Sequence, residues 1–125
     1  MVKRNNRKTG ERGERAAGEM LGQKGYEIIA KNYRNKWGEI DIIVKKKVRD
    51  EDYVMFVEVK TKADDSYGEP WEMIDSRKLK RVENMGYLWC EEFSWDGLCR
   101  IDVVGVWLDI MGEVSKIKHW ENVQL

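Results

Sequence analysis

The sequence predicts a single α/β domain, in which helices flank a central sheet in the order helix, three strands, helix, strand. Two observations favour this class. Segments with apolar residues at helical spacing alternate with runs of β-branched and aromatic residues that are typical of strands. The length of 125 residues suits one hydrophobic core and leaves no room for a second. We therefore expect residues 9–125 to fold as one domain.

A first helix is predicted over residues 10–24, with Thr9 as its N-cap. Ala17 and Leu21 follow Glu14 at helical spacing, so Glu14 lies at the leading end of an apolar stripe. A carboxylate on such a stripe is stabilised by the helix dipole, by an ion pair or by a nearby metal. The sequence of this helix, taken by itself, favours the helix dipole as the explanation for Glu14.

Three strands are expected next. Residues 26–33 have strand composition, and residues 38–44 and 53–60 read as the two arms of a β-hairpin. The most hydrophilic point between the arms is Arg49-Asp50, which predicts the centre of the turn. Residues opposite each other would then have numbers that sum to 99, as 49 and 50 do.

This register places two acids and a lysine on one face of the hairpin. Asp41 faces Glu58 because 41 and 58 sum to 99, and Lys60 shares the face of Glu58. Each acid interrupts an apolar run, and opposed carboxylates repel unless a cation or a proton lies between them. Such a set suits Mg²⁺ and metal-assisted phosphodiester hydrolysis. The alternative is an edge hairpin with a solvated, ordinary ion pair, and the hairpin by itself favours neither.

The second half of the chain continues the alternation. Residues 63–69 have loop composition, and Pro70 suits the first position of a short helical turn. A second helix is predicted over residues 76–93, followed by strands over residues 98–107 and 114–120. The apolar stripe of this helix comprises Leu79, Val82, Gly86, Trp89 and Phe93.

Charge is balanced overall but unevenly distributed. The chain has 23 Lys/Arg and 23 Asp/Glu, yet residues 1–36 hold ten basic against four acidic residues and residues 83–125 hold three against eight. A polarised molecule can bind a polyanion on one face, because screening makes local charge decisive. The basic residues 1–8 are expected to form a disordered tail.

Other features limit the class of protein. No apolar run is long enough to span a membrane, and no signal-peptide core follows the basic start, so we expect a cytoplasmic protein without a membrane partner. Cys90 and Cys99 form no metal-binding spacing and are expected to be free thiols. His119, the only histidine, lies in an alternating segment and is expected to be structural rather than catalytic.

Several ordered motifs resemble the YraN-like family of predicted endonucleases, a branch of the PD-(D/E)XK superfamily related to archaeal Holliday-junction resolvases. The resemblance covers about residues 9–104. The matching segments are residues 10–17 (GERGERAA), 32–34 (NYR), 38–43 (GEIDII), 56–61 (FVEVKT), 67–70 (YGEP) and 100–104 (RIDVV). It implies a restriction-endonuclease-like fold with a central mixed β-sheet.

The resemblance also implies a function and roles for particular residues. The expected activity is Mg²⁺- or Mn²⁺-dependent cleavage of structured or branched DNA, including single-stranded regions, as in Holliday-junction resolvases. Asp41, Glu58 and Glu14 would hold the metal, and Lys60 would be the catalytic lysine. The candidate contacts to DNA are Arg12, Arg34, Lys62, Arg77, Lys78 and Arg81.

Two further expectations concern assembly and an alternative function. Cleavage of two strands needs two active sites, so a homodimer joined through the apolar C-terminal strands is a reasonable expectation. The alternative function is a non-catalytic module that binds nucleic acid or a protein partner on a nuclease fold. Such a module has no chemical need for Asp41, Glu58 and Lys60 together, which favours the enzyme.

Overall fold

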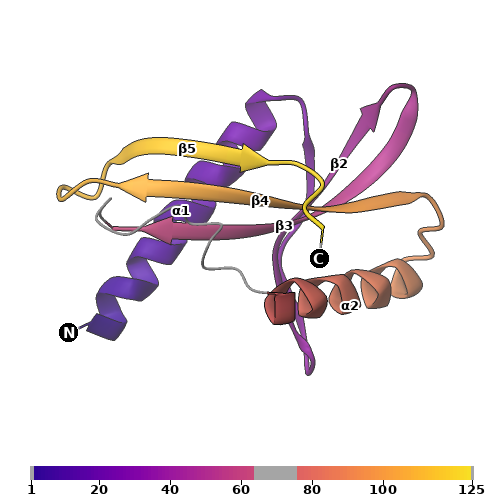
Figure 1. Cartoon of the computed structure of the whole chain (residues 1–125), viewed down its shortest axis with the longest axis horizontal. Coiled ribbons are helices and arrows are strands. Elements are labelled where there is room, and N and C mark those ends of the chain that lie inside the picture. Colours follow the sequence, from indigo (N-terminus) through magenta and orange to yellow (C-terminus); the bar gives the residue numbers. More distant parts are fainter. Residues whose placement is uncertain (1, 64–75, 125) are drawn as a thin grey trace.

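Two helices and a five-stranded sheet make up the computed structural model, which describes residues 2–63 and 76–124, with side chains from Arg7 onward (Figure 1). In chain order the elements are α1 (Val2–Gln23), β1 (Glu27–Asn35), β2 (Gly38–Val48), β3 (Glu51–Lys62), α2 (Ser76–Glu92), β4 (Leu98–Leu108) and β5 (Val114–Trp120). This order agrees with the predicted one. Among the described residues, neither helix is long and apolar enough to cross a membrane.

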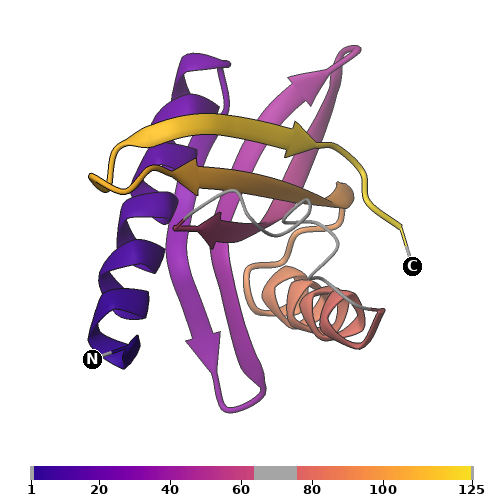
Figure 2. The ribbon, with the colours of Figure 1, turned by 60° about the vertical axis from the view of Figure 1, so that its left-hand side comes forward.

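The sheet is mixed, as expected, and its strands are neighbours in the order of the sequence. β1, β2 and β3 form an antiparallel meander, β4 lies parallel to β3, and β5 returns antiparallel to β4. The parallel step follows the connection that contains α2, because parallel neighbours need a crossover. The β1–β2 and β2–β3 hairpins project in opposite directions from the sheet (Figures 1 and 2).

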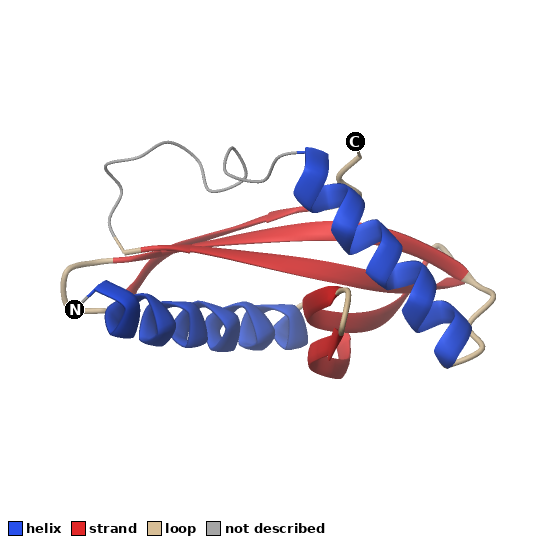
Figure 3. Cartoon of the chain, turned by 90° about the horizontal axis from the view of Figure 1, so that it is seen from below, coloured by secondary structure: helices blue, strands red, loops and turns tan. Residues whose placement is uncertain are grey.

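The two helices cover opposite faces of the sheet, so the core has two layers (Figures 2 and 3). Ala17 and Leu21 of α1 pack against Ile42, Val57 and Val104 on one face. On the other face α2 covers a second cluster, which includes Ile40, Ile43, Val54, Phe56, Val82, Met85 and Trp89. Burial on both faces explains why the central strands are almost continuously apolar.

The start of α1 is a correction. The helix begins at Val2 rather than after Thr9, so it includes most of the residues 1–8 that we expected to be a disordered tail. Thr9 lies inside the helix and is not its N-cap. An ion pair between Arg7 and Glu11, four residues apart, supports this part of the helix. The apolar stripe itself is as predicted, because Ala17 and Leu21 are fully buried.

The hairpin register is confirmed. β2 and β3 pair from Ile42 with Val57 to Val48 with Glu51, and every pair sums to 99. Arg49 and Asp50 both have positive φ, of 52° and 67°, which is the conformation of a type I′ turn. This two-residue turn matches the twist of the strands, and it fixes the register in which β2 pairs with β3.

The remaining predictions are mostly confirmed. α2 begins at Ser76, and β5 has the predicted bounds. Phe93 was wrongly placed on the buried stripe of α2: the helix ends at Glu92, Phe93 is mainly exposed, and Met85 is buried instead. The predicted loop after Ala63 and the turn at Pro70 lie outside the described residues.

A polar network inside the core joins β4 to β5. Asp102 is fully buried and accepts hydrogen bonds from Arg100 Nε and Asn122 N at 2.9 and 3.0 Å. His119 Nε2 lies 2.9 Å from the other oxygen of Asp102, and its Nδ1 lies 2.7 Å from Lys24 Nζ. Burial raises the pKa of Asp102, but these partners outweigh it and the pKa is lowered. His119 therefore belongs to the network that joins β4 to β5.

Candidate active site

The candidate site lies where β2 separates from β3. Pairing between these strands begins at Ile42, whereas residues 38–40 pair with β1. At the separation Asp41 Oδ2 accepts a hydrogen bond of 2.7 Å from the backbone N–H of Val59. If the β2–β3 ladder continued, a backbone carbonyl would accept this hydrogen bond, and here the Asp41 side chain accepts it instead. The bond holds the Asp41 carboxylate against β3.

Asp41 and Glu58 lie together at this point. Their carboxyl groups are within hydrogen-bond reach of each other, and only 5% of Glu58 is exposed. Burial, followed by the charge of Glu58, raises the pKa of Asp41 to about 8. Two carboxylates in one half-buried site repel each other, so either a proton on Asp41 or a nearby positive charge must relieve the repulsion.

Two further acids surround Asp41. Carboxylate oxygens of Glu14, Glu39 and Asp41 lie within 4.8 Å of one another. Burial, then the charges of Glu39 and Glu58, raises the pKa of Glu14. Oxygen ligands at this spacing suit a hard divalent cation. Glu14 reaches the site because the middle of α1 crosses the end of β3, where Gly13 packs against the side chain of Thr61.

Asn32 of β1 connects two of these acids. In the amide orientation that satisfies both groups, its nitrogen donates to Glu14 Oε1 at 3.1 Å and to Glu39 Oε1 at 3.2 Å. Asn32 has a φ of 52°, a left-handed conformation that asparagine adopts more readily than most residues. The backbone at Asn32 is therefore shaped so that its side chain can hold Glu14 and Glu39 in place.

Two lysines supply positive charge on the other side of the acids. Lys78 Nζ, in the first turn of α2, lies 2.9 Å from Glu58 Oε2 and within hydrogen-bond reach of Lys60. Burial, then the neighbouring Lys78, lowers the pKa of Lys60. Burial lowers the pKa of Lys78 as well, but its bonds to Lys60 and Glu58 outweigh that effect and its pKa is raised. Of the two amines, Lys60 therefore releases its proton more readily.

The residues expected to contact DNA fall into two groups. Arg12 and Arg34 are paired with acids, Arg12 Nη2 to Glu113 Oε2 at 2.7 Å and Arg34 Nε to Glu39 Oε2 at 3.0 Å. Lys62 is only 8% exposed, so it offers little surface to a phosphate. Arg77 and Arg81, by contrast, are exposed on α2. Lys78 belongs to the acid cluster rather than to the exposed face of α2.

Sequence reasoning missed Glu39 and Asn32. Alternation along β2 was a signal for Glu39, because side chains two apart on a strand share a face and Asp41 was already assigned. No comparable signal existed for Asn32, whose contribution depends on its left-handed backbone and on the approach of α1 from outside the sheet.

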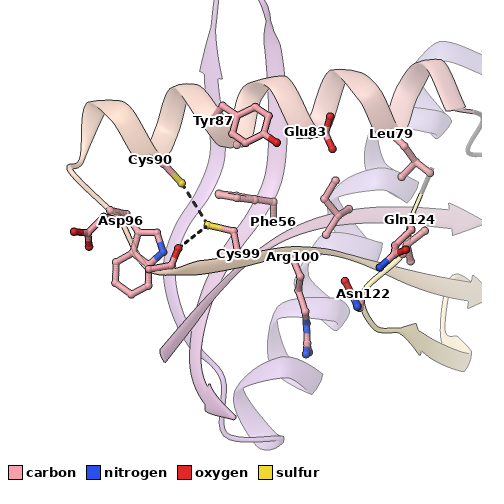
Figure 4. Close-up of a pocket in the computed structure, with 15 residues that line it drawn as sticks. Phe56, Leu79, Glu83, Tyr87, Cys90, Asp96, Cys99, Arg100, Asn122 and Gln124 are labelled. Carbon is pink, nitrogen blue, oxygen red and sulfur yellow. Dashed lines mark hydrogen bonds between the residues drawn. The ribbon is translucent and has the colours of Figure 1, made fainter. Parts of the chain in front are cut away.

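A separate hollow of about 650 Å³ lies between α2, the start of β4 and the C-terminal segment (Figure 4). Its lining includes Phe56, Tyr87 and Trp95 but none of the four acids or Lys60. Cys90 and Cys99 both line it, with their Sγ atoms 3.4 Å apart, and both are free thiols (Figure 4). This hollow is not part of the acid cluster.

The mixed five-stranded sheet, its flanking helices and the element order define the fold as an α/β protein with a restriction-endonuclease-like core. The chain belongs to the uncharacterised protein family UPF0102, whose model matches residues 13–106. The resemblance to the YraN-like family is thereby confirmed.

Relatives across bacteria support this assignment. The chain is 35% identical to a UPF0102 protein of Pelotomaculum thermopropionicum over 114 residues, which is 90% of this chain and 92% of the relative. A UPF0102 protein of Pelobacter propionicus is 38% identical over 94% of this chain and 82% of its own length. A third, from Symbiobacterium thermophilum, is 42% identical over 80% of this chain and 82% of its own length.

Proposed function

We propose that this protein is a metal-dependent endonuclease that hydrolyses phosphodiester bonds in structured or branched DNA, as Holliday-junction resolvases do. One observation carries the proposal: Asp41, Glu58 and Lys60 converge where β2 leaves β3, with Glu14 beside them. Four titratable groups in one half-buried place destabilise a fold, and such clusters are typical of functional sites.

The residues present fit Mg²⁺ or Mn²⁺. Glu14, Glu39 and Asp41 offer oxygens within 4.8 Å of one another, and Glu58 adds a fourth carboxylate beside Asp41. We propose that Asp41, Glu58 and Glu14 hold the ion, with Glu39 as a further ligand. A bound divalent cation would polarise the scissile phosphate and favour hydroxide over water as the nucleophile.

The two lysines have different roles in this proposal. Lys60, whose pKa is lowered, accepts a proton from the attacking water or orients it. Lys78, whose pKa is raised, stays charged and neutralises Glu58 until a metal or phosphate approaches. Asn32 is a positioning residue, because it holds Glu14 and Glu39 without reaching the reacting atoms.

Contacts to the DNA backbone are proposed for the exposed arginines. Arg77 and Arg81 lie on the same helix as Lys78, so phosphates flanking the scissile one would meet α2. Arg34 can join them if DNA competes with Glu39 for its guanidinium group. We also propose that cleavage of both strands uses a homodimer.

A cleavage screen with purified protein tests the function. The substrates are duplex, single-stranded, flap and four-way-junction DNA, each with Mg²⁺, with Mn²⁺ or with a chelator. We expect metal-dependent nicking of branched or single-stranded DNA, and its loss in Asp41→Ala and Lys60→Ala. Asp52→Ala and Lys47→Ala are matched controls, because these residues form an exposed ion pair on the same hairpin.

The screen also separates the alternative, a non-catalytic binding module. A module would bind DNA in a salt-sensitive manner and would be indifferent to metal and to Lys60→Ala. Cleavage that survives Asp41→Ala would reject the assignment of the metal site. Binding without cleavage of any substrate, under either metal, would favour the module over the enzyme.

A further inference from the structure

The tip of the β1–β2 hairpin presents an exposed tryptophan beside an exposed tyrosine. Trp37 is 64% exposed, and Tyr87 of α2 is 66% exposed. Both line one hollow between the hairpin tip and α2, together with Arg81, Asn84, Met85 and Leu88. We call this hollow the aromatic hollow. Large aromatic side chains that share an exposed concave surface indicate a ligand with flat apolar faces.

Positive charge continues directly from the aromatic hollow. A second hollow, at the start of α2, is lined by Ser76, Arg77, Lys80, Arg81 and Asn84. Arg81 and Asn84 line both hollows, so the two form one continuous surface along α2. No acidic residue lines either hollow among the described residues. A chain of phosphates would therefore find cations at one end of the surface and aromatic rings at the other.

Trp37 also borders a further hollow, in which acidic and basic side chains are mixed. The lining of this hollow includes Glu91, Glu92 and Lys36, and Lys36 Nζ lies 5.1 Å from the centre of the Trp37 ring. Tyr33 donates a hydrogen bond of 2.6 Å to Glu92, which fixes that carboxylate nearby. With two acids against one lysine, this hollow attracts a polyanion less than the surface that includes Arg77 and Arg81.

The surface is also joined to the candidate active site. Gly38, at the hairpin tip, packs against the side chains of Arg81 and Met85 of α2. Only one residue beyond Gly38 lies Glu39 of the acid cluster, and Lys78 of the same helix contacts Glu58. The aromatic rings thus lie one short segment of β2 away from Glu39 and about two and a half turns of α2 away from Lys78.

We propose that Trp37 and Tyr87 stack on unpaired bases of a single DNA strand whose phosphates lie along Arg77 and Arg81. The proposal rests on the endonuclease function above and narrows its substrate to DNA with an unpaired segment next to the cleavage point. Bases inside a duplex are already stacked on their neighbours and do not offer their faces. A charged groove combined with stacking aromatics is the usual design for binding single strands without sequence preference.

An equilibrium binding experiment tests the stacking separately from cleavage. Full-length protein in a chelating buffer is titrated into a fluorescent oligo-dT and into an abasic oligonucleotide with the same number of phosphates. The two probes differ only in their bases, so phosphate contacts contribute equally. We expect oligo-dT to bind roughly tenfold more tightly, in line with one to two stacked bases.

The variants locate the preference on the rings. Trp37→Ala should remove most of the difference between the probes, whereas Trp37→Phe should retain much of it. Arg81→Ala should weaken binding of both probes by a similar factor. Ile110→Ala is the control, because Ile110 is 94% exposed in the β4–β5 turn, away from both hollows.

Two results would overturn the inference. One is equal affinity of the wild-type protein for oligo-dT and the abasic probe. The other is an unchanged preference in Trp37→Ala together with a lower molecular mass in solution, which would assign the aromatic surface to contact with a second copy of the chain. A base preference without cleavage of any substrate would reject the nuclease and keep the stacking site. Cleavage without a base preference would keep the nuclease and reject the stacking site.

Discussion

The ammonium group of Lys78 lies 2.9 Å from Oε2 of Glu58, inside the acid cluster rather than on the surface of α2. The side chain of Glu58 is 6% exposed, so its charge has little water to stabilise it. Lys78 therefore occupies one side of a carboxylate that we propose as a metal ligand. A divalent cation and this ammonium group would compete for the same negative charge.

Removal of that competitor should strengthen metal binding. We expect Lys78→Met to bind Mn²⁺ about tenfold more tightly than the wild-type protein, a change of about 1.4 kcal/mol. Isothermal titration with Mn²⁺ measures it. Lys80→Met is the control, since Lys80 lies on the exposed face of the same helix and pairs with Glu83. Equal affinities in Lys78→Met and the wild type would show that Lys78 does not hold the metal-binding oxygen of Glu58.

Close approach of α1 to β3 predicts a glycine that cannot be replaced. A Cβ atom added to Gly13 would lie 2.8 Å from Thr61 Cβ and nearer still to its hydroxyl oxygen. Gly13→Ala should push the helix away and destabilise the protein by about 1–3 kcal/mol in urea unfolding. Gly10→Ala, in the same helix with no atom within 4 Å, should instead stabilise it by about 0.5–1 kcal/mol.

The outcome for Gly13 also bears on the site, because Glu14 is the next residue. Displacement of α1 should move Glu14 away from Glu39 and Asp41 and weaken Mn²⁺ binding as well as stability. Gly10→Ala should leave Mn²⁺ binding unchanged. Similar stability in the two alanine variants would contradict the tight packing between Gly13 and Thr61.

Prediction from sequence succeeded where local rules decide the structure. Arg49-Asp50 set the turn, and a two-residue turn leaves one register, so the pairing of β2 with β3 could be predicted from the residue numbers. The ladder ends at Ile42 and Val57, and Asp41 accepts a hydrogen bond from the backbone of Val59 beyond it. The start of α1 was missed, because a Thr followed by Gly is a typical helix boundary and nothing local shows that the helix continues through it. The ion pair between Arg12 and Glu113 joins segments about a hundred residues apart, which no local pattern indicates.

Stability of the metal-free protein should fall as pH rises. The pKa of Asp41 is about 8 in the folded chain against an ordinary value of 3.8, so between these values the folded state holds a proton that the unfolded state has lost. The slope of unfolding free energy with pH is then negative, and stability is lost from about pH 4 to pH 8. Melting temperatures in a chelating buffer across this range should decline.

Asp41→Asn isolates this effect from other titrating groups. We expect the variant to melt several degrees above the wild type at about pH 8 and near it at about pH 5. Mg²⁺ should raise the melting temperature of the wild type more at the higher pH and do little for the variant. Asp52→Asn, an exposed acid on the same hairpin, is the control. If Asp41→Asn melted below the wild type at pH 8, the charge of Asp41 would not be repelled by the neighbouring carboxylates.

Cys90 and Cys99 should form an intramolecular disulfide on treatment with oxidised glutathione. Their sulfur atoms are 3.4 Å apart, so an approach of about 1.4 Å reaches bonding distance. Burial, then the neighbouring Cys90, raises the pKa of Cys99 to about 12, so the thiol persists at neutral pH and the exchange should be slow there and faster in alkali.

Intact-mass measurement follows this reaction. One thiolate attacks glutathione disulfide and releases one glutathione, and the second thiol then displaces the other, so the protein loses two hydrogens and gains no adduct. Cys99→Ser should stop at the mixed disulfide with one glutathione attached. The closed form should be about 2 kcal/mol more stable, because the bond links the end of α2 to the start of β4. A wild-type protein that carries two glutathione adducts would show that the sulfurs do not face each other in solution.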